Sequence, residues 1–162
     1  MSKGGDYLRG FYKAVGGASR NSEIAKRTYS GVHKFVFRVS GGRVWNSMRG
    51  GDILLMTSIG CRSGVKRCNA LLTVQHHDGY CVIGSNAGGP TDPAWVSNLM
   101  ADPRAWLTLP KGSELAVRAR RVTDGHEWEA IFQCFVAVHD GYAAYVKATS
   151  RRLPIFVLEP LS

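Results

Sequence analysis

The spacing of apolar and polar positions changes once along the chain, from a helical to an extended period. Over about 22–40, apolar side chains return at helical spacing from Ile24 to Val39, and a Gly-Gly pair then ends the run. Asn21 or Ser22 can cap the start of this segment. The pattern predicts an N-terminal amphipathic helix, with basic side chains between its apolar positions.

After a second glycine pair at 50–51, short apolar runs alternate with turn-forming residues, as is typical of strands. The dipeptide Asp78-Gly79 is a hairpin signal, and Pro110-Lys111-Gly112 marks a second hairpin. The runs predict strands over 53–58, 67–75, 80–84, 104–109, 113–122 and 153–158.

Helical segments interrupt the strands. Pro93 suits the first turn of a helix that reaches about residue 100, because the N–H that proline lacks has no helical partner there. Asp124 begins a helix that ends near Val138, and a further helix covers about 142–149. Since hairpins rather than crossover helices join the strands, the order predicts an α+β fold built on an antiparallel barrel, not a parallel sheet.

The chain has enough hydrophobic residues for one domain, and its charge is unevenly distributed along the sequence. The 162 residues are 44% hydrophobic and 20% charged, which is enough to bury one core. We expect a basic, flexible N-terminus over 1–20 and a single domain over 21–162 that includes the helix. The net charge is +9; the first 67 residues carry +10 and the rest of the chain −1. It suits an anionic small molecule, an anionic lipid surface or nucleic acid.

Several classes of protein are disfavoured by features that the sequence lacks. The apolar runs are too short for a membrane span and the N-terminus does not resemble a signal peptide, so we expect a cytoplasmic protein. The basic helix leaves peripheral contact with the inner face of an anionic membrane open. The four cysteines lack CxxC spacing and no cluster predicts a metal site. Nucleic-acid binding is not expected, because no aromatic platform is interleaved with the basic residues.

A basic loop between the first two predicted strands can bind an anion. Residues 60–67 contain three cations, two glycines and Ser63, without an acidic residue. Glycines such as Gly64 let backbone N–H groups approach an anion, and Arg62 or Arg67 can make paired contacts to phosphate oxygens. A solvated turn is the simpler interpretation, and the segment is not a P-loop because it leads into a strand.

Two later segments can border a flat ligand. The loop 85–92 precedes a helix N-terminus, where backbone amides can meet an anion, although it can also be a plain connection. In that helix Trp95 and Asn98 share a face, although core packing is the more common role of such an indole. Tyr142 and Tyr145 share a face of a later helix, one turn after His139; a phenol there can orient a carbonyl or nitro group and share a proton, or simply pack.

In their order and spacing, these segments resemble the deazaflavin-dependent nitroreductase family, the F420-binding branch of the split-barrel flavin and deazaflavin oxidoreductases. The resemblance covers about 29–160. It rests on Leu54 to Gly60, Arg62-Ser63-Gly64, Arg67, Ser85, Gly88, Pro90, Pro93-Ala94-Trp95, Asn98-Leu99, Asp102-Pro103, Tyr142, Tyr145, Thr149, Arg151, Pro154 and Leu158-Glu159-Pro160.

The resemblance implies a split β-barrel that binds reduced coenzyme F420 and passes a hydride to a quinone, an enone or a nitroaromatic compound. It implies that the basic loop holds the phosphate and acidic tail of the cofactor, and that the 85–89 loop and the Trp95/Asn98 helix flank the deazaflavin. It places Tyr142 beside the substrate with Tyr145 near it, and it leaves these tyrosines, Ser85 or a water as the proton donor. The implied cofactor-binding residues are Arg62, Ser63, Gly64, Arg67, Ala70, Ser85, Asn86, Ala87, Gly88, Gly89, Trp95 and Asn98.

Two positions depart from the family pattern. Ala70 stands where many relatives have proline, and Asn86 stands where they commonly have lysine. The first change removes a rigid backbone position and the second removes a cation, so both can weaken F420 binding. Two alternatives therefore stay open: an FMN-dependent split-barrel oxidoreductase, and a non-catalytic protein that binds or carries F420. The sequence also leaves monomer and homodimer open.

Overall fold

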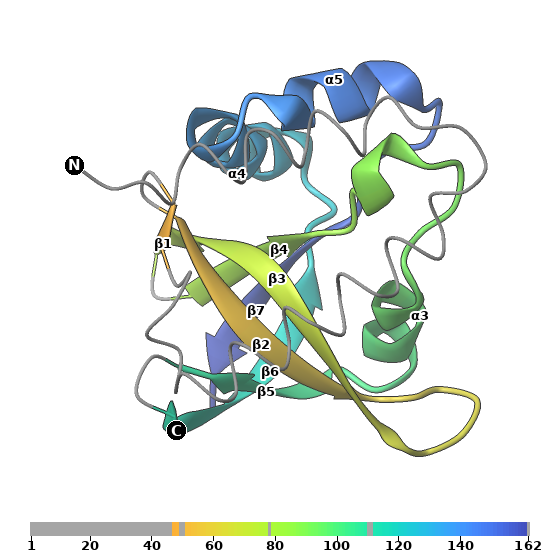
Figure 1. The fold of residues 1–162 in the computed structure, drawn as a ribbon, viewed down its shortest axis with the longest axis vertical. Coiled ribbons are helices and arrows are strands. Elements are labelled where there is room, and N and C mark those ends of the chain that lie inside the picture. The colour runs from red at the N-terminus through yellow and green to blue at the C-terminus, as the bar shows by residue number, and fades with distance from the viewer. Residues whose placement is uncertain (1–46, 49–50, 78, 110–111, 162) are drawn as a thin grey trace.

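The computed structural model describes residues 47–48, 51–77, 79–109 and 112–161. The elements in chain order are β1 (Ser47–Met48), β2 (Gly51–Ile59), β3 (Lys66–His76), β4 (Gly79–Ile83), the 3-10 turn η1 (Asn86–Gly88), α3 (Ala94–Ala101), β5 (Arg104–Thr108), β6 (Glu114–Arg121), α4 (Gly125–Val138), α5 (Gly141–Ala148) and β7 (Ile155–Pro160) (Figure 1). The predicted N-terminus 1–20 and the helix over about 22–40 lie outside the described residues.

Six antiparallel strands close into a barrel. Neighbouring strands follow the order β2, β3, β4, β7, β6 and β5, and a β2–β5 pairing joins the two ends. The closing register places Met56 opposite Leu107 and Ser58 opposite Ala105. Closure protects the edges of β2 and β5, which would otherwise offer unpaired backbone groups to other chains. The arrangement confirms the predicted α+β fold, an antiparallel barrel with helical insertions.

The barrel interior is filled by alternate residues of its strands, because successive side chains of a strand point to opposite faces. The buried interior residues are Leu54, Met56, Val82, Ala105, Leu107, Val117, Ala119, Phe156 and Leu158. Trp95, Val96 and Leu99 of α3 join this cluster, and the Trp95 ring meets the Phe156 ring edge-on at 6.0 Å between centroids. The apolar face of α3 therefore completes the core.

A second core lies outside the barrel, beneath α4 and α5. Figure 1 shows these helices on the same side of the molecule. Ile131 and Phe135 of α4 pack in one cluster with Cys81 of β4 and Val157 of β7. The carboxylate of Asp124 accepts a hydrogen bond from the Glu127 N–H at 2.8 Å and so caps the start of α4, as predicted.

Some boundaries differ from the predicted ones. The last strand begins at Ile155 rather than at residue 153, because the Leu153 carbonyl accepts the Trp128 indole N–H (2.8 Å) and the Pro154 carbonyl accepts the Gly84 N–H (2.8 Å). The loop 85–92 contains η1, which the pattern did not predict. Within the described ranges, no helix has both the length and the apolar character needed to cross a bilayer.

Candidate active site

The basic loop joins β2 to β3 and is a compact, glycine-dependent turn. The Gly60 N–H donates to the Val65 carbonyl (2.9 Å), and the Gly64 N–H donates to the Gly60 carbonyl (2.8 Å). Gly64 adopts a φ of +66°, and a Cβ on Gly60 would lie 2.9 Å from the Ser63 Oγ. The positive φ of Gly64 favours glycine, and the close approach of the loop at Gly60 leaves little room for a side chain there.

The side chains of this loop face solvent and are cationic. Arg62, Lys66 and Arg67 are all exposed, and the Lys66 ammonium lies 4.6 Å from the centroid of the Trp106 ring. The Ser63 Oγ accepts the Val65 N–H at 3.4 Å, so its O–H can still donate to a ligand. The donor set consists of guanidinium, ammonium and hydroxyl groups, which suits a phosphate or carboxylate group.

Asn98 fixes the basic loop to α3. Its Oδ1 accepts the Cys61 N–H at 3.0 Å and its Nδ2 donates to the Ser58 Oγ at 3.4 Å, while the residue is 6% exposed. Trp95 is 5% exposed and belongs to the barrel core. The structure thus places both predicted residues in the interior, where Asn98 holds the basic loop and Trp95 packs in the barrel core.

The 84–92 segment, called the turn loop here, follows β4 and has an unusual backbone. Asn86, Ala87 and Gly88 have φ values of +45°, +51° and +75°. The left-handed region costs about 1–3 kcal/mol for a residue other than glycine, and such conformations cluster at functional sites. The Asn86 amide donates to the Thr91 carbonyl at 3.0 Å, so this side chain stabilises the loop internally.

A residue outside the predicted site holds the turn loop. The Arg151 guanidinium donates to the carbonyls of Gly84 (3.0 Å), Ser85 (2.8 Å) and Gly89 (3.0 Å). It also contacts the Asp92 carboxylate at 2.6 Å. Arg151 belongs to the motif that carries the family resemblance, but no local pattern in the sequence assigns it these partners, which precede it by 59 to 67 residues.

The candidate tyrosines lie on α5 beside His139. The Tyr142 and Tyr145 ring centroids are 5.6 Å apart, and the His139 ring lies 5.7 Å from the first and 6.3 Å from the second. Tyr142 is 8% exposed, whereas Tyr145 is half-buried. Burial lowers the pKa of His139, and the nearby Asp140 carboxylate partly opposes this shift.

Close contacts bring the turn loop and α5 together. A Cβ on Gly88 would lie 3.1 Å from the Ala148 Cβ and 3.2 Å from the Tyr145 Cα. This approach places the predicted residues of the turn loop, Ser85 to Gly89, against the tyrosine-bearing helix.

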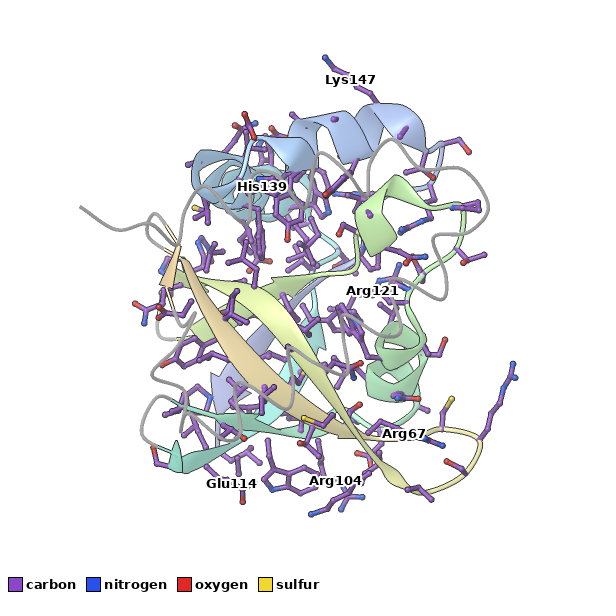
Figure 2. All side chains as sticks on the ribbon, in the orientation of Figure 1. Arg67, Arg104, Glu114, Arg121, His139 and Lys147 are labelled. Atoms are coloured by element: carbon purple, nitrogen blue, oxygen red, sulfur yellow. The ribbon has the colours of Figure 1, made fainter. Side chains whose placement is uncertain are left out.

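Helix α3 connects the basic loop to the turn loop, because it contacts both. Asn98 of α3 binds the start of the basic loop, and a Cβ on Gly84 would lie 2.9 Å from a methyl group of Val96. In Figure 1 the β2–β3 loop, α3 and η1 follow one another along one side of the barrel, with α5 beside η1. Figure 2 shows Arg67 by the basic loop and His139 between α4 and α5, at opposite ends of this arrangement.

Ala70 lies on β3, the strand that follows the basic loop. It is half-buried and pairs with Leu55 of β2, on the face of the sheet that points away from the barrel interior. Over the residues that the structure describes, no group of three His, Cys, Asp or Glu side chains could hold a metal ion.

A family model and a curated relative point to the same family. A model of the family described as F420H(2)-dependent quinone reductase matches residues 30–160. An F420H(2)-dependent quinone reductase of Mycobacterium tuberculosis is 25% identical over 132 residues, which are 78% of this chain and 87% of the relative.

Solved structures extend the comparison to the fold. One described as an F420-H2 dependent reductase (FDR-A) has 30% identity and a TM-score of 0.60, covering 66% of this chain and 93% of its own. Another, described as a domain-swapped dimer, has 27% identity and a TM-score of 0.63, covering 87% of this chain and 100% of its own. With the family model matching most of the chain, these similarities show that the protein belongs to the F420H(2)-dependent quinone reductase family and is a split-barrel oxidoreductase that uses reduced coenzyme F420.

Proposed function

We propose that this protein carries a hydride from reduced F420 to a flat, lipophilic acceptor that lies beside the turn loop and α5. A quinone is the first candidate acceptor, as the family description indicates, and an enone or a nitroaromatic compound has a similar shape and electron demand. The observation that carries the proposal is the joining, through α3, of an acid-free basic loop to a loop packed against α5, the helix that bears Tyr142 and Tyr145.

The donor set of the basic loop fits the anionic end of the cofactor. Arg62, Ser63 and Arg67 would hold its phosphate and acidic tail, because exposed guanidinium groups make paired hydrogen bonds to such oxygens. Bound F420H2 supplies the hydride from its deazaflavin. The chain itself supplies placement: Asn98 fixes the basic loop, and the backbone from Ser85 to Gly89 would flank the ring.

The acceptor would contact the tyrosines of α5. Tyr142 would orient the acceptor oxygen through its hydroxyl and share a proton as negative charge develops there. Tyr145 and Ser85 are the other groups of this chain that could donate a proton. The apolar surroundings of Tyr142, which packs on Phe135 with 5.3 Å between ring centroids, favour a lipophilic partner.

We also propose that the basic N-terminal segment brings the protein to an anionic membrane, where lipophilic quinones reside. Lys26, Arg27, Lys34 and Arg38 are interleaved with apolar positions of the predicted helix. This segment lies outside the described residues.

The test separates cofactor binding from turnover. We expect Arg62→Ala and Arg67→Ala to weaken F420 binding about 10- to 100-fold, since a hydrogen bond to a charged group contributes about 1.5–3 kcal/mol. Tyr142→Phe should change the Kd little and lower kcat about 100-fold or more. Fluorescence titration gives the Kd for F420 and FMN, and reoxidation of F420H2 by a menaquinone analogue gives kcat.

Arg104→Ala is the matched control, because this arginine is exposed and paired with Asp102 at 2.8 Å. Equal loss of F420 binding in the Tyr142, Arg62 and Arg67 variants would contradict the division of roles. Tight F420 binding without reoxidation of F420H2 by any acceptor would favour a protein that carries F420. Tighter binding of FMN than of F420 would contradict the assignment of F420 as the cofactor.

A further inference from the structure

The contacts of Arg151 are concentrated on one loop. Its Nε, Nη1 and Nη2 atoms donate to the backbone carbonyls of Gly89, Gly84 and Ser85, and its Nη1 also reaches Asp92. The side chain is 16% exposed, so these bonds are largely shielded from water. A guanidinium in this position joins the two ends of the turn loop.

The turn loop depends on such external support. It includes two residues other than glycine, Asn86 and Ala87, in the left-handed region. Residues other than glycine keep a left-handed conformation when several contacts with the surrounding structure hold them in it. Internal bonds at Gly88 and Gly89 close the turn itself, and the Arg151 side chain ties both ends of the loop to the segment between α5 and β7.

Arg151 also relates the turn loop to the tyrosine helix. It follows the end of α5 at Ala148 by three residues, and Gly88 packs directly on the backbone of Tyr145. The Arg151 bonds and the Gly88 packing therefore both contribute to the position of Ser85 relative to the tyrosine helix, beside the backbone bond of Gly84 to Pro154.

We propose that Arg151, anchored by Asp92, is a positioning residue that holds the turn loop against α5 so that the cofactor ring and the acceptor meet in a reactive geometry. The inference rests on the proposed function, because it assigns a purpose to the loop that would flank the deazaflavin. Arg151 acts through the loop and does not itself contact the reacting atoms.

The planar guanidinium is essential to this role. Lysine keeps the positive charge, but its ammonium is a single point and cannot reach carbonyls on both ends of the loop and a carboxylate in one plane. We therefore expect Arg151→Lys to loosen the turn loop, although the charge is conserved. Asp92→Asn should give a weaker effect in the same direction, because it removes the negative charge from one of the four contacts but keeps an oxygen that can accept the hydrogen bond.

The experiment measures loop mobility and catalysis separately in the full-length protein. Hydrogen–deuterium exchange of peptides covering 84–92, without cofactor, should be faster in Arg151→Lys than in the wild type. Turnover with F420H2 and a menaquinone analogue should fall about 10- to 100-fold in kcat, as expected for a displaced reacting group. The Kd for F420 should change much less, since the basic loop is intact.

Arg120→Lys is the matched control. Arg120 also makes several bonds, to Glu127 and Glu159, but these join β6 to α4 and β7 away from the turn loop. It should leave both exchange at 84–92 and kcat unchanged. In Arg151→Ala, millimolar guanidinium should restore part of kcat, which a general loss of folding would not permit.

The outcomes are distinguishable. Unchanged exchange at 84–92 in Arg151→Lys, or faster exchange with unchanged kcat, overturns the positioning role while the proposed function stands. A wild-type protein that binds no F420 and reduces no quinone overturns the proposed function and the inference with it. If Arg151→Ala does not fold, the comparison between Arg151→Lys and Arg120→Lys still tests whether Arg151 positions the turn loop.

Discussion

Single residues of the candidate site fall into two groups, those that face solvent and those whose bonds are made inside the protein. Arg62 and Arg67 are exposed and can change partner when a ligand arrives. Asn98 and Arg151 instead use their polar atoms on the backbone of the two loops. Substitutions in the first group should act on ligand affinity, whereas those in the second should act on the geometry of the loops.

His139 differs from both groups because its charge can change near neutral pH. Its side chain is 19% exposed and lies against the rings of Tyr142 and Tyr145. Burial disfavours the imidazolium, so its pKa lies below the ordinary value of 6.5 even with Asp140 at 3.6 Å.

This shift predicts a pH dependence of stability. Above the ordinary pKa of 6.5 the imidazole is neutral in both states, so stability is fully retained there. As the pH falls toward the folded-state pKa, the unfolded chain takes up a proton more readily than the folded one, and the free energy of unfolding decreases. We expect His139→Phe, which keeps a ring against the tyrosines, to flatten this decline in thermal melts between about pH 8 and pH 5.

The carboxylates provide the internal reference for that measurement. The Arg104 hydrogen bonds lower the pKa of Asp102 to about 2, and the Arg120 hydrogen bonds lower the pKa of Glu127. Their contributions are lost in more acidic solution and should be shared by both proteins. An identical slope near neutrality in the wild type and the His139 variant would exclude His139 as its source.

Among the elements, η1 is the one whose backbone is least ordinary. It joins β4 to α3 through a left-handed turn and packs on α5 at Gly88. A side chain at this glycine would be strained by its φ of +75° and would also press on Tyr145. The element therefore requires glycine for two independent reasons.

We expect Gly88→Ala to lower the free energy of unfolding by about 1–3 kcal/mol. Ala87→Gly is the matched control in the same turn, since Ala87 is exposed with a φ of +51°. It should be neutral or stabilise by up to about 1 kcal/mol. Urea unfolding measures both, and an equal loss in the two variants would show that the left-handed turn is not preserved in solution.

Across the whole molecule, the charge and the catalytic apparatus are unevenly placed. The first 67 residues, which include the predicted basic helix and the basic loop, carry a net charge of +10, and the rest of the chain carries −1. If the loop serves the cofactor, the helix remains for the membrane. The two basic segments should therefore be separable by substitution.

Replacement of Lys26, Arg27, Lys34 and Arg38 by glutamine tests this separation. A basic residue near an anionic surface contributes about 1 kcal/mol, so binding to phosphatidylglycerol vesicles should fall steeply while F420 affinity is kept. Arg62→Ala with Arg67→Ala should show the opposite pattern. Cosedimentation with anionic and neutral vesicles measures the first property, and undiminished binding of the four-fold variant to anionic vesicles would contradict the proposal.

The sequence alone was enough to predict the elements whose signal lies in neighbouring residues. The hairpin from β3 to β4, the capped start of α4 at Asp124 and the alternation in the strands are properties of neighbouring residues, and each was confirmed. Spacing alone indicated the cations of the basic loop, because residues 60–67 form one turn. Helical spacing also singled out the tyrosines of α5, and the family resemblance added their place beside the substrate, which remains a prediction.

Tertiary structure alone decided how these parts meet. Closure of the barrel by β2 and β5 joins segments about 50 residues apart, and the Arg151 bonds reach back 59 to 67 residues to the turn loop. Trp95 and Asn98 share a helix face in the sequence, and it is packing that turned that face toward the core and the basic loop. Such contacts depend on the whole fold because their energy comes from burial and hydrogen bonds between distant segments, which no local pattern of residues encodes.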